Sequence, residues 1–136
     1  MSLLLEIVTP EKKAYSGTVE ALTLPTTKGE VGILSGHIPM IVTLIPGEID
    51  IESQGRADIL AVDKGFAQIW GDKVSVLTEG AIDVEDIDLD AVEQAQARAE
   101  RALAKAHKER KDSSNIEHLE QVIRFSLTQK LIKKRR

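Results

Sequence analysis

The distribution of glycine and proline divides this chain into two parts. All 9 glycines and all 4 prolines lie before Leu89, and the segment from Leu89 to Arg136 contains neither residue. Glycine and proline interrupt helices and shape tight turns, so only the second part can form long helices. The first part must consist of short segments joined by turns. This contrast predicts an α+β chain with a β domain over residues 1–86 and a helical domain over residues 87–136.

Short apolar runs at regular spacing fill the first part. The segment Glu48-Ile-Asp-Ile-Glu52 alternates strictly between charged and apolar residues, which is the two-residue period of a strand with one wet face. Dipeptides such as Pro46-Gly47 and Gly71-Asp72 stand where hairpin turns belong. Many short strands with no helix between them predict an antiparallel β-sandwich. We expect its strands at residues 3–8, 19–24, 31–34, 40–44, 48–52, 58–62, 66–70 and 74–77.

The second part predicts two helices. Asp86 or Asp88 can cap the first helix with its carboxylate. The apolar positions of this helix recur at three- and four-residue spacing and are mostly alanine, namely Leu89, Val92, Ala95, Ala99, Ala102, Leu103 and Ala106. A stripe of small residues permits another helix to approach closely, but it buries little apolar surface.

A polar break at residues 111–115 precedes the second helix, and Ser114 with Glu117 forms the capping-box pattern that starts it. The apolar stripe of this helix is bulkier and comprises Ile116, Leu119, Ile123, Leu127 and Leu131. These large side chains can face the alanines of the first helix in an antiparallel hairpin. Three further apolar residues lie off the stripe, namely Val122, Phe125 and Ile132. They either pack on the β domain or form a second apolar face for another protein.

Charge also separates the two parts. Residues 1–86 hold 6 Lys or Arg and 14 Asp or Glu, a net charge of -8, whereas residues 87–136 hold 12 and 8, a net charge of +4. The second helix ends in a basic cluster of Lys130, Lys133, Lys134, Arg135 and Arg136. An acidic protein surface is the natural target of this cluster. Nucleic acid is not favoured as a partner, because stacking aromatics make up only 3% of the chain and the body is acidic. The absence of cysteine excludes disulfides and thiolate metal sites.

The stretch with the most specific pattern runs from Gly29 to Pro39 and reads Gly-Glu-Val-Gly-Ile-Leu-Ser-Gly-His-Ile-Pro. Its three glycines permit sharp turns or positive φ, and its proline holds the preceding residue in an extended conformation. We expect a short strand followed by a shaped turn that displays Ser35 and His37. A small hydrolase using His37 is one hypothesis, but no nucleophile, metal cluster or cofactor motif accompanies this histidine. A contact surface for a partner is the favoured interpretation.

Several motifs together point to one family. They are Ile7-Val-Thr-Pro10, Tyr15-Ser-Gly-Thr-Val-Glu20, the Gly29 to Pro39 stretch, Thr43-Leu-Ile-Pro-Gly47, Gly65-Phe, Val74-Ser-Val-Leu77 and Asp88-Leu-Asp90. With these motifs the chain resembles, nearly from end to end, the epsilon subunit of bacterial and chloroplast F-type ATP synthases. The resemblance implies a non-catalytic subunit of the central stalk that couples ion translocation to ATP synthesis. It would be a peripheral part of the complex at the cytoplasmic face of the cell membrane, or at the stromal face of a thylakoid.

The resemblance also implies partners for each part. The sandwich would contact the gamma subunit and the c subunits of the membrane rotor ring through Glu30, Ser35 and His37. The hairpin would permit rotation when folded on the sandwich. When extended along gamma, it would enter the alpha/beta head and inhibit ATP hydrolysis, and its contacts with a beta subunit would be made by Arg124, Lys130, Lys133 and Lys134. The resemblance implies no cofactor, no metal and no direct insertion into the membrane.

One motif of the family is altered in this chain. Some members bind ATP on the hairpin through an Ile/Leu-Asp-x-x-Arg-Ala motif, and the aligned residues here are Leu89-Asp90-Ala91-Val92-Glu93-Gln94. Glu93 places a carboxylate where a cation should attract phosphate. We therefore predict weak or no ATP binding through Leu89, Asp90, Glu93 and Gln94. The alternative to a stalk subunit is a free-standing β-sandwich adaptor with a helical interaction arm.

Overall fold

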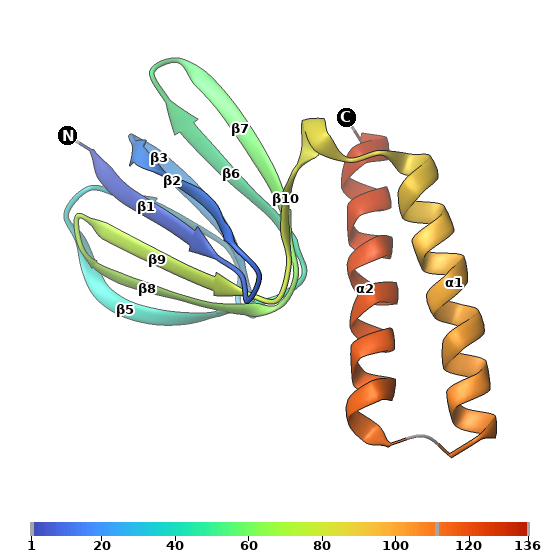
Figure 1. Cartoon of the computed structure of the whole chain (residues 1–136). Coiled ribbons are helices and arrows are strands. Elements are labelled where there is room, and N and C mark those ends of the chain that lie inside the picture. The colour runs from blue at the N-terminus through green and yellow to red at the C-terminus, as the bar shows by residue number, and fades with distance from the viewer. Residues whose placement is uncertain (1, 111, 136) are drawn as a thin grey trace.

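A computed structural model describes residues 2–110 and 112–135, apart from the side chain of His37, and contains a β-sandwich followed by two helices (Figure 1). The expected α+β fold class is therefore confirmed. The strands are β1 (Leu3–Val8), β2 (Lys13–Val19), β3 (Ala21–Thr26), β4 (Gly29–Leu34), β5 (His37–Leu44), β6 (Gly47–Ser53), β7 (Arg56–Val62), β8 (Gly65–Gly71), β9 (Lys73–Thr78) and β10 (Ala81–Asp83). The helical elements are η1 (Val84–Asp86), α1 (Leu89–Lys108) and α2 (Ser113–Arg135). Among the described residues, no helix has the length and apolar character that crossing a membrane requires.

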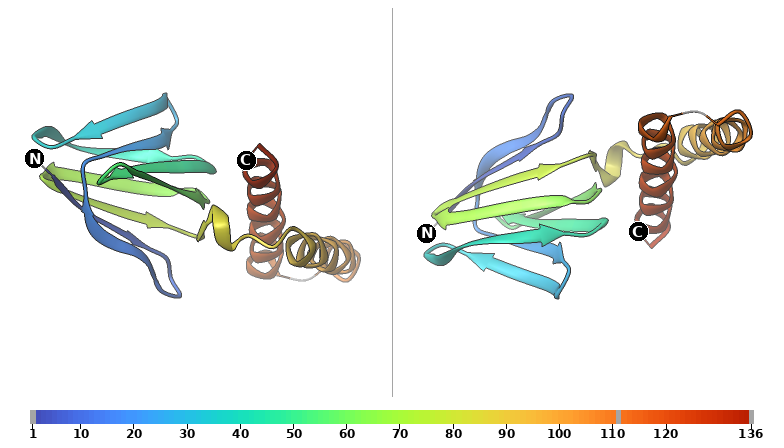
Figure 2. Two further views of the ribbon diagram at one scale, coloured as in Figure 1. Left: turned by 90° about the horizontal axis from the view of Figure 1, so that it is seen from above. Right: turned by 90° about the horizontal axis from the view of Figure 1, so that it is seen from below.

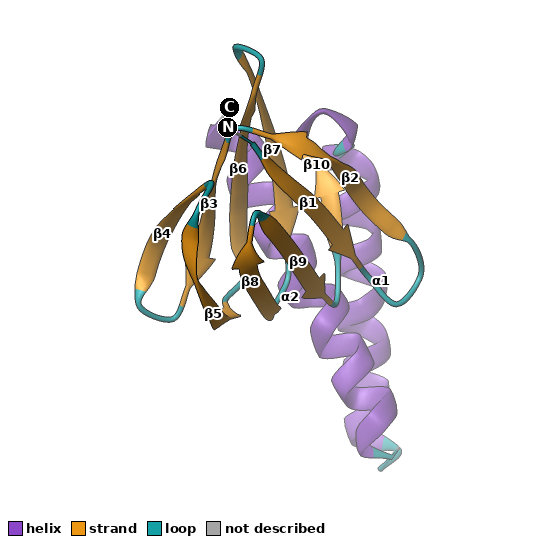
Figure 3. Cartoon of the chain, turned by 90° about the vertical axis from the view of Figure 1, so that its left-hand side faces the viewer, coloured by secondary structure: helices purple, strands orange, loops and turns teal. Residues whose placement is uncertain are grey.

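Hydrogen bonding joins the strands in the order β10-β7-β6-β3-β5-β8-β9-β1-β2, with β4 paired to β3. The sheet folds back on itself where β3 meets β5, at the pair Thr26 and Leu44. One layer then holds β4, β3, β6, β7 and β10, and the other holds β5, β8, β9, β1 and β2 (Figure 3). The core lies between the layers, and alternate residues of β1 point into it, namely Leu3, Leu5 and Ile7.

The strands differ from the sequence-based expectation in two respects. β1 and β9 pair in parallel, with Leu5 opposite Val74, although the other strand pairs are antiparallel. These two strands are far apart in the chain, so no hairpin turn sets their relative direction. The apolar pattern also fails to predict two strands. In β2 the buried residue is Val19, and β10 has only 3 residues. The expected strand 19–24 is divided at Glu20, where β2 ends and β3 follows.

The glycines of the first part serve different purposes. Gly29 and Gly36 have φ angles of 104° and 80°, which favour glycine, as the pattern of the Gly29 to Pro39 stretch predicts. Gly32 lies inside β4 without a positive φ. Gly65 is required by close packing, because a Cβ there would lie 2.0 Å from the carbonyl oxygen of Leu77. Glycine thus lets β8 approach β9 at this point.

An aspartate directly precedes each of the two long helices. The carboxylate of Asp88 accepts hydrogen bonds from two amides in the first turn of α1, at 3.0 and 3.2 Å, so this expected cap is confirmed. The expected cap of α2 is wrong. Asp112, rather than Ser114, accepts a hydrogen bond from the Asn115 amide, at 2.9 Å, and Ser114 already lies in the first turn. Aspartate caps as well as serine, and its negative charge also suits the positive end of a helix.

The two helices form an antiparallel hairpin in which α2 lies between α1 and the sandwich (Figures 1 and 2). The buried residues of α1 are Val92, Ala99 and Ala106. The expected stripe of α2 is wrong at its C-terminal end, because Leu127 and Leu131 are exposed, the latter to 64%. Ile132 is buried instead, and Phe125 packs beside it toward the sandwich. α2 has neighbours on two sides, so residues off the predicted stripe pack on the β domain.

Candidate functional site

α2 docks on the sandwich through a small apolar cluster. Its buried members are Ala61, Val84, Ile87, Val92 and Ile132. Ile132 comes from α2 and Ala61 from β7, so the cluster joins the hairpin to the sandwich. Phe125 lies against Gly80, where an added Cβ would be only 2.8 Å from the ring. The cluster is smaller than the sandwich core, so apolar burial alone holds the hairpin less firmly than it holds the sheet together.

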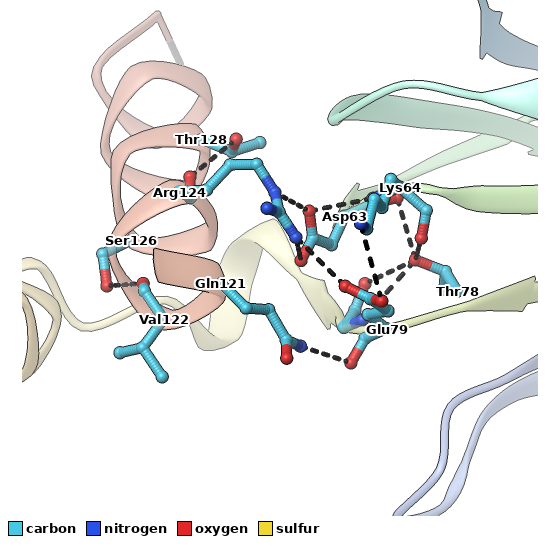
Figure 4. A network of polar contacts seen from close by, with 10 residues as sticks. Asp63, Lys64, Thr78, Glu79, Gln121, Val122, Arg124, Ser126 and Thr128 are labelled. Carbon is cyan, nitrogen blue, oxygen red and sulfur yellow. Dashed lines mark hydrogen bonds and ion pairs between the residues drawn. The ribbon is translucent and has the colours of Figure 1, made fainter. Parts of the chain in front are cut away.

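A network of charges lies beside this cluster (Figure 4). The Nε and Nη2 atoms of Arg124 in α2 donate to the two carboxylate oxygens of Asp63, at 2.7 and 2.9 Å, and Nη2 also donates to Glu79, at 3.0 Å. Asp63, between β7 and β8, is completely buried. Its hydrogen bond raises the pKa of Arg124 above the ordinary value, although partial burial opposes this shift. The guanidinium is therefore a permanent cation that compensates a buried anion.

The same network extends from Arg124 into the sandwich. The Nε2 atom of Gln121 donates to the carbonyl oxygen of Glu79, at 3.3 Å, and the ammonium of Lys64 lies 4.0 Å from the Glu79 carboxylate. The hydroxyl of Thr78 donates to the carbonyl oxygen of Asp63, at 2.8 Å. The chain around Asp63 is thus held from the sheet on one side and from α2 on the other (Figure 4).

Other basic residues of α2 also have partners within the chain. Lys133 donates to a carbonyl oxygen of η1, at 2.9 Å. Lys130 donates to the side-chain oxygen of Gln96 in α1, also at 2.9 Å, and Arg135 forms an ion pair with a carboxylate of β6. Lys134 is exposed. Arg124 and Lys133 therefore join α2 to the β7–β8 connection and to η1, whereas Lys130 joins the two helices to each other. The resemblance assigns all three residues to a contact with a beta subunit, and that contact stays a prediction.

The sandwich residues predicted to contact a partner do not lie together. Glu30 stands near the β3–β4 turn, whereas Ser35 follows the opposite end of β4. Five residues of extended strand separate them by about 16 Å. The Ser35 hydroxyl donates to Asp72 Oδ1, at 2.7 Å, so it is used within the chain. The side chain of His37 lies outside the described parts of the structure, and its assigned contact stays a prediction.

One outer face of the sandwich is rich in apolar side chains. We define the apolar face, on β5, β8, β9 and β1, by its exposed residues Leu4, Ile41, Phe66, Trp70 and Leu77. Phe66 and Leu77 are directly opposite each other on β8 and β9. They border an apolar groove of about 550 Å³ that reaches Pro10. Exposed apolar clusters of this kind mark interaction surfaces.

The residues of the altered ATP motif lie in the first turns of α1. Asp90, Glu93 and Gln94 are exposed, and Leu89 is half-buried. Asp88 is engaged as the helix cap. Among the residues that the structure describes, no group of three His, Cys, Asp or Glu side chains could hold a metal ion. Weak or absent ATP binding stays a prediction.

Sequence reasoning missed three carboxylates of these sites, Asp63, Asp72 and Glu79. Each lies at a turn between strands, where acidic residues are common and need no partner. Their contacts come from residues 61, 37 and 45 positions away in the chain, which no local pattern encodes. One signal was available for Asp63, because it directly follows the apolar run 59–62. A carboxylate beside such a run is seldom buried without a cationic partner.

Comparisons with known proteins agree with this architecture. Residues 2–84 match the family model for the beta-sandwich domain of the ATP synthase delta/epsilon chain. The ATP synthase epsilon chain of Halalkalibacterium halodurans is 35% identical over 116 residues, which cover 85% of this chain and 87% of the relative. That of Pelotomaculum thermopropionicum is 42% identical over 101 residues, or 74% and 75% of the two chains. Among solved structures, a chain of the Euglena gracilis mitochondrial ATP synthase (OSCP/F1/c-ring) has a TM-score of 0.68 at 24% identity, covering 96% of this chain and 81% of that chain. At that identity the likeness shows a shared fold.

Proposed function

The chain belongs to the delta/epsilon chain family of ATP synthases, and we propose that it is a non-catalytic rotor subunit in the central stalk of such a complex. In this role it couples ion translocation to ATP synthesis and inhibits ATP hydrolysis through its hairpin. The observation that carries the proposal is the position of Arg124, whose guanidinium holds the hairpin to the sandwich through Asp63 and Glu79.

The sandwich offers two separate contact regions for a central-stalk position. The apolar face fits the gamma subunit, because an apolar surface of this kind is stabilised when a partner covers it. Glu30, at the other end of β4 from Ser35, is assigned to the c subunits of the rotor ring. The Euglena chain with the same fold is part of an OSCP/F1/c-ring complex.

The hairpin is the regulatory element of the chain in this role. In the folded arrangement Arg124 is bound to Asp63 and Glu79, while Lys130 and Lys133 have partners in α1 and η1. In an extended arrangement, Arg124, Lys130, Lys133 and Lys134 would instead contact an acidic segment of a beta subunit in the alpha/beta head. One guanidinium cannot serve both sets of carboxylates. The two arrangements therefore exclude each other, and the hairpin is a two-state element whose balance depends on which anions hold its cations.

Substitutions on the two sides of the ion pair test this proposal in the reassembled complex. Asp63→Asn weakens the folded arrangement but leaves Arg124 available to a beta subunit, so inhibition of ATP hydrolysis should increase. Arg124→Gln weakens the folded arrangement and also removes the cation. Inhibition of ATP hydrolysis should therefore increase less than in Asp63→Asn, or should fall below that of the wild type. Deletion of residues 88–136 should abolish inhibition and leave coupled ATP synthesis intact. Lys64→Gln, a change at an exposed ion pair of the same network, is the matched control.

Three results would contradict the proposal. Unchanged ATP hydrolysis after the deletion, under all conditions, excludes the inhibitory role. Equal effects of Asp63→Asn and Arg124→Gln exclude competition for the same cation. Failure of the chain to co-purify with ATP synthase subunits, as a peripheral part of the complex on the cytoplasmic side, favours the free-standing adaptor instead.

A further inference from the structure

A short segment of residues 84–88, the hinge segment, is the covalent connection between the sandwich and the hairpin (Figure 1). It begins with η1 and continues through Ile87 and Asp88 to the start of α1. Aspartates cap both helical elements, because Asp83 Oδ1 accepts a hydrogen bond from the Glu85 amide, at 2.9 Å, and Asp88 caps α1. Ile87 has a φ of -75° and a ψ of 120°, so the chain is extended between them. A hairpin that moves relative to the sandwich must change dihedral angles in or next to this segment.

One carbonyl group of the hinge segment accepts two hydrogen bonds. The carbonyl oxygen of Val84 accepts from the Ile87 amide, at 3.2 Å, which closes the turn of η1. It also accepts from the ammonium of Lys133, at 2.9 Å, although Lys133 lies 49 positions further along the chain, near the end of α2. The charge of the ammonium strengthens this hydrogen bond. The carbonyl that closes η1 is therefore also an attachment point of α2.

Apolar packing holds the hinge segment at the same place. Val84, Ile87 and Ile132 belong to one buried cluster, with exposed fractions of 8%, 5% and 1%. Ile132 directly precedes Lys133, so neighbouring residues of α2 contact the apolar side chains and the main chain of the hinge segment. Without α2 this apolar surface would be exposed to water, and η1 would be closed by the Ile87 amide. A single turn closed by one hydrogen bond is unstable by itself, so η1 depends on the end of α2.

The surroundings of Lys133 favour a cation. Asp58, Asp83 and Glu85 line a cavity of about 300 Å³ together with Lys133. Lys133 is half-buried, whereas the next residue, Lys134, is exposed. Nearby carboxylates attract an ammonium, and they do so more strongly where water is partly excluded. The acidic cavity therefore keeps the charge of Lys133 at the hinge segment, and the Val84 carbonyl gives it a defined contact.

We propose that Lys133 locks the hinge segment, because its bond to the Val84 carbonyl keeps η1 folded only while the last turns of α2 are docked. Arg124 precedes Lys133 by 9 residues, which is about 14 Å along the helix axis, and its partner Asp63 lies outside the hinge segment. The arginine thus holds the hairpin to the sheet, whereas the lysine holds the segment about which the hairpin turns. This inference rests on the proposed function for its consequence, which is that release of the end of α2 frees the regulatory hairpin to turn.

Amide hydrogen exchange, followed by NMR in the isolated full chain, tests this lock at single residues. The Ile87 amide reports the hinge segment. The Lys64 amide, which donates to Asp63 Oδ1 at 2.8 Å, reports the other point at which α2 is docked. Lys133→Met removes the ammonium and keeps an unbranched side chain. Lys134→Met removes the same charge from the adjacent, exposed residue and is the matched control.

We expect exchange at Ile87 to become about tenfold faster in Lys133→Met, because the hydrogen bond that closes η1 opens more often once the ammonium is removed. Exchange at Lys64 should change by less than about twofold, because the ion pair of Arg124 is a separate attachment. Lys134→Met should exchange like the wild type at both amides. The difference between Ile87 and Lys64 distinguishes a lock on the hinge segment from a general loosening of the hairpin.

Each other outcome has a distinct meaning. Unchanged exchange at Ile87 in Lys133→Met overturns the inference. Equal acceleration in Lys133→Met and Lys134→Met also overturns it, because the loss of charge, and not of the contact, would then be the cause. Equal acceleration at Ile87 and Lys64 shows that the hairpin leaves as a whole, without a separate lock. The proposed function fails by a different result, since unchanged ATP hydrolysis after deletion of residues 88–136 excludes inhibition without altering exchange in the isolated chain.

Discussion

Arg124 and Asp63 are 61 positions apart in the chain, yet the guanidinium Nε lies 2.7 Å from the carboxylate Oδ1. Asp63 belongs to the sandwich and Arg124 to α2, so this ion pair joins the two parts of the molecule. The carboxylate is completely buried, whereas the arginine side chain is 34% exposed. The pair thus joins a buried carboxylate to a partly solvated guanidinium.

Removal of this arginine should destabilise the folded hairpin. Arg124→Met leaves Asp63 buried without a cation, and we expect a loss of about 2 kcal/mol, below the values of fully buried pairs because the guanidinium is partly solvated. In a double-mutant cycle with Asp63→Asn, the coupling energy should be about 1–3 kcal/mol. Urea unfolding and protease cleavage of the hairpin measure both quantities. Lys64→Met is the control, since its exposed pair with Glu79 should contribute less than about 1 kcal/mol. A coupling energy near zero would show that the ion pair does not hold the hairpin.

Gly80→Ala should loosen the hairpin by a steric route. The new Cβ would lie 2.8 and 2.9 Å from two ring atoms of Phe125, so the ring must move, at a cost of about 1–3 kcal/mol. Gly32→Ala is the matched control, because its Cβ would meet nothing within 4 Å and its backbone has no positive φ. Protease cleavage of the hairpin should increase in the first variant alone. Adding Phe125→Leu should restore part of the loss, and equal behaviour of the two glycine variants would contradict the expected clash.

The phenol of Tyr15 should titrate above its ordinary pKa of 10.0. Burial raises this pKa most, and the negative charge of Asp58 raises it further. The folded chain thus favours the neutral phenol, and this stabilisation is fully present below about pH 10 and lost as the pH rises through the folded pKa. Tyr15 is the single tyrosine, so phenolate absorbance measures it directly. Asp58→Asn should lower the pKa but leave it raised, and a wild-type midpoint at or below 10.0 would refute this prediction.

The isolated chain should bind ATP weakly or not at all. Glu93 is exposed in the first turns of α1, where the family motif has an arginine, and its carboxylate repels phosphate. Isothermal titration of the full chain with ATP measures this directly. Glu93→Arg together with Gln94→Ala restores the motif and should increase the affinity. Saturable binding of ATP by the unmodified chain at micromolar concentration would disprove the prediction.

Local patterns in the sequence predict much of this fold. The period-two alternation and the turn residues place most strands, and the Asp88 cap places the start of α1, because these signals depend on the hydrogen bonds and faces of one segment. β2 was missed because it is an edge strand with one buried residue, Val19, and no regular alternation of polar and apolar residues. The parallel pairing of β1 and β9 was missed because no short connection between them sets a direction.

The sequence by itself determined the two-part architecture, the helix-forming segment and the separation of acidic and basic charge. Tertiary structure alone decided which side of α2 is buried, and it turned Leu131 to solvent and Ile132 to the sandwich. It also brought Arg124 to Asp63 and Ser35 to Asp72. The physical reason is range: a helix or a strand is encoded by neighbours in the chain, whereas a contact across dozens of residues depends on how all the packed elements are placed together.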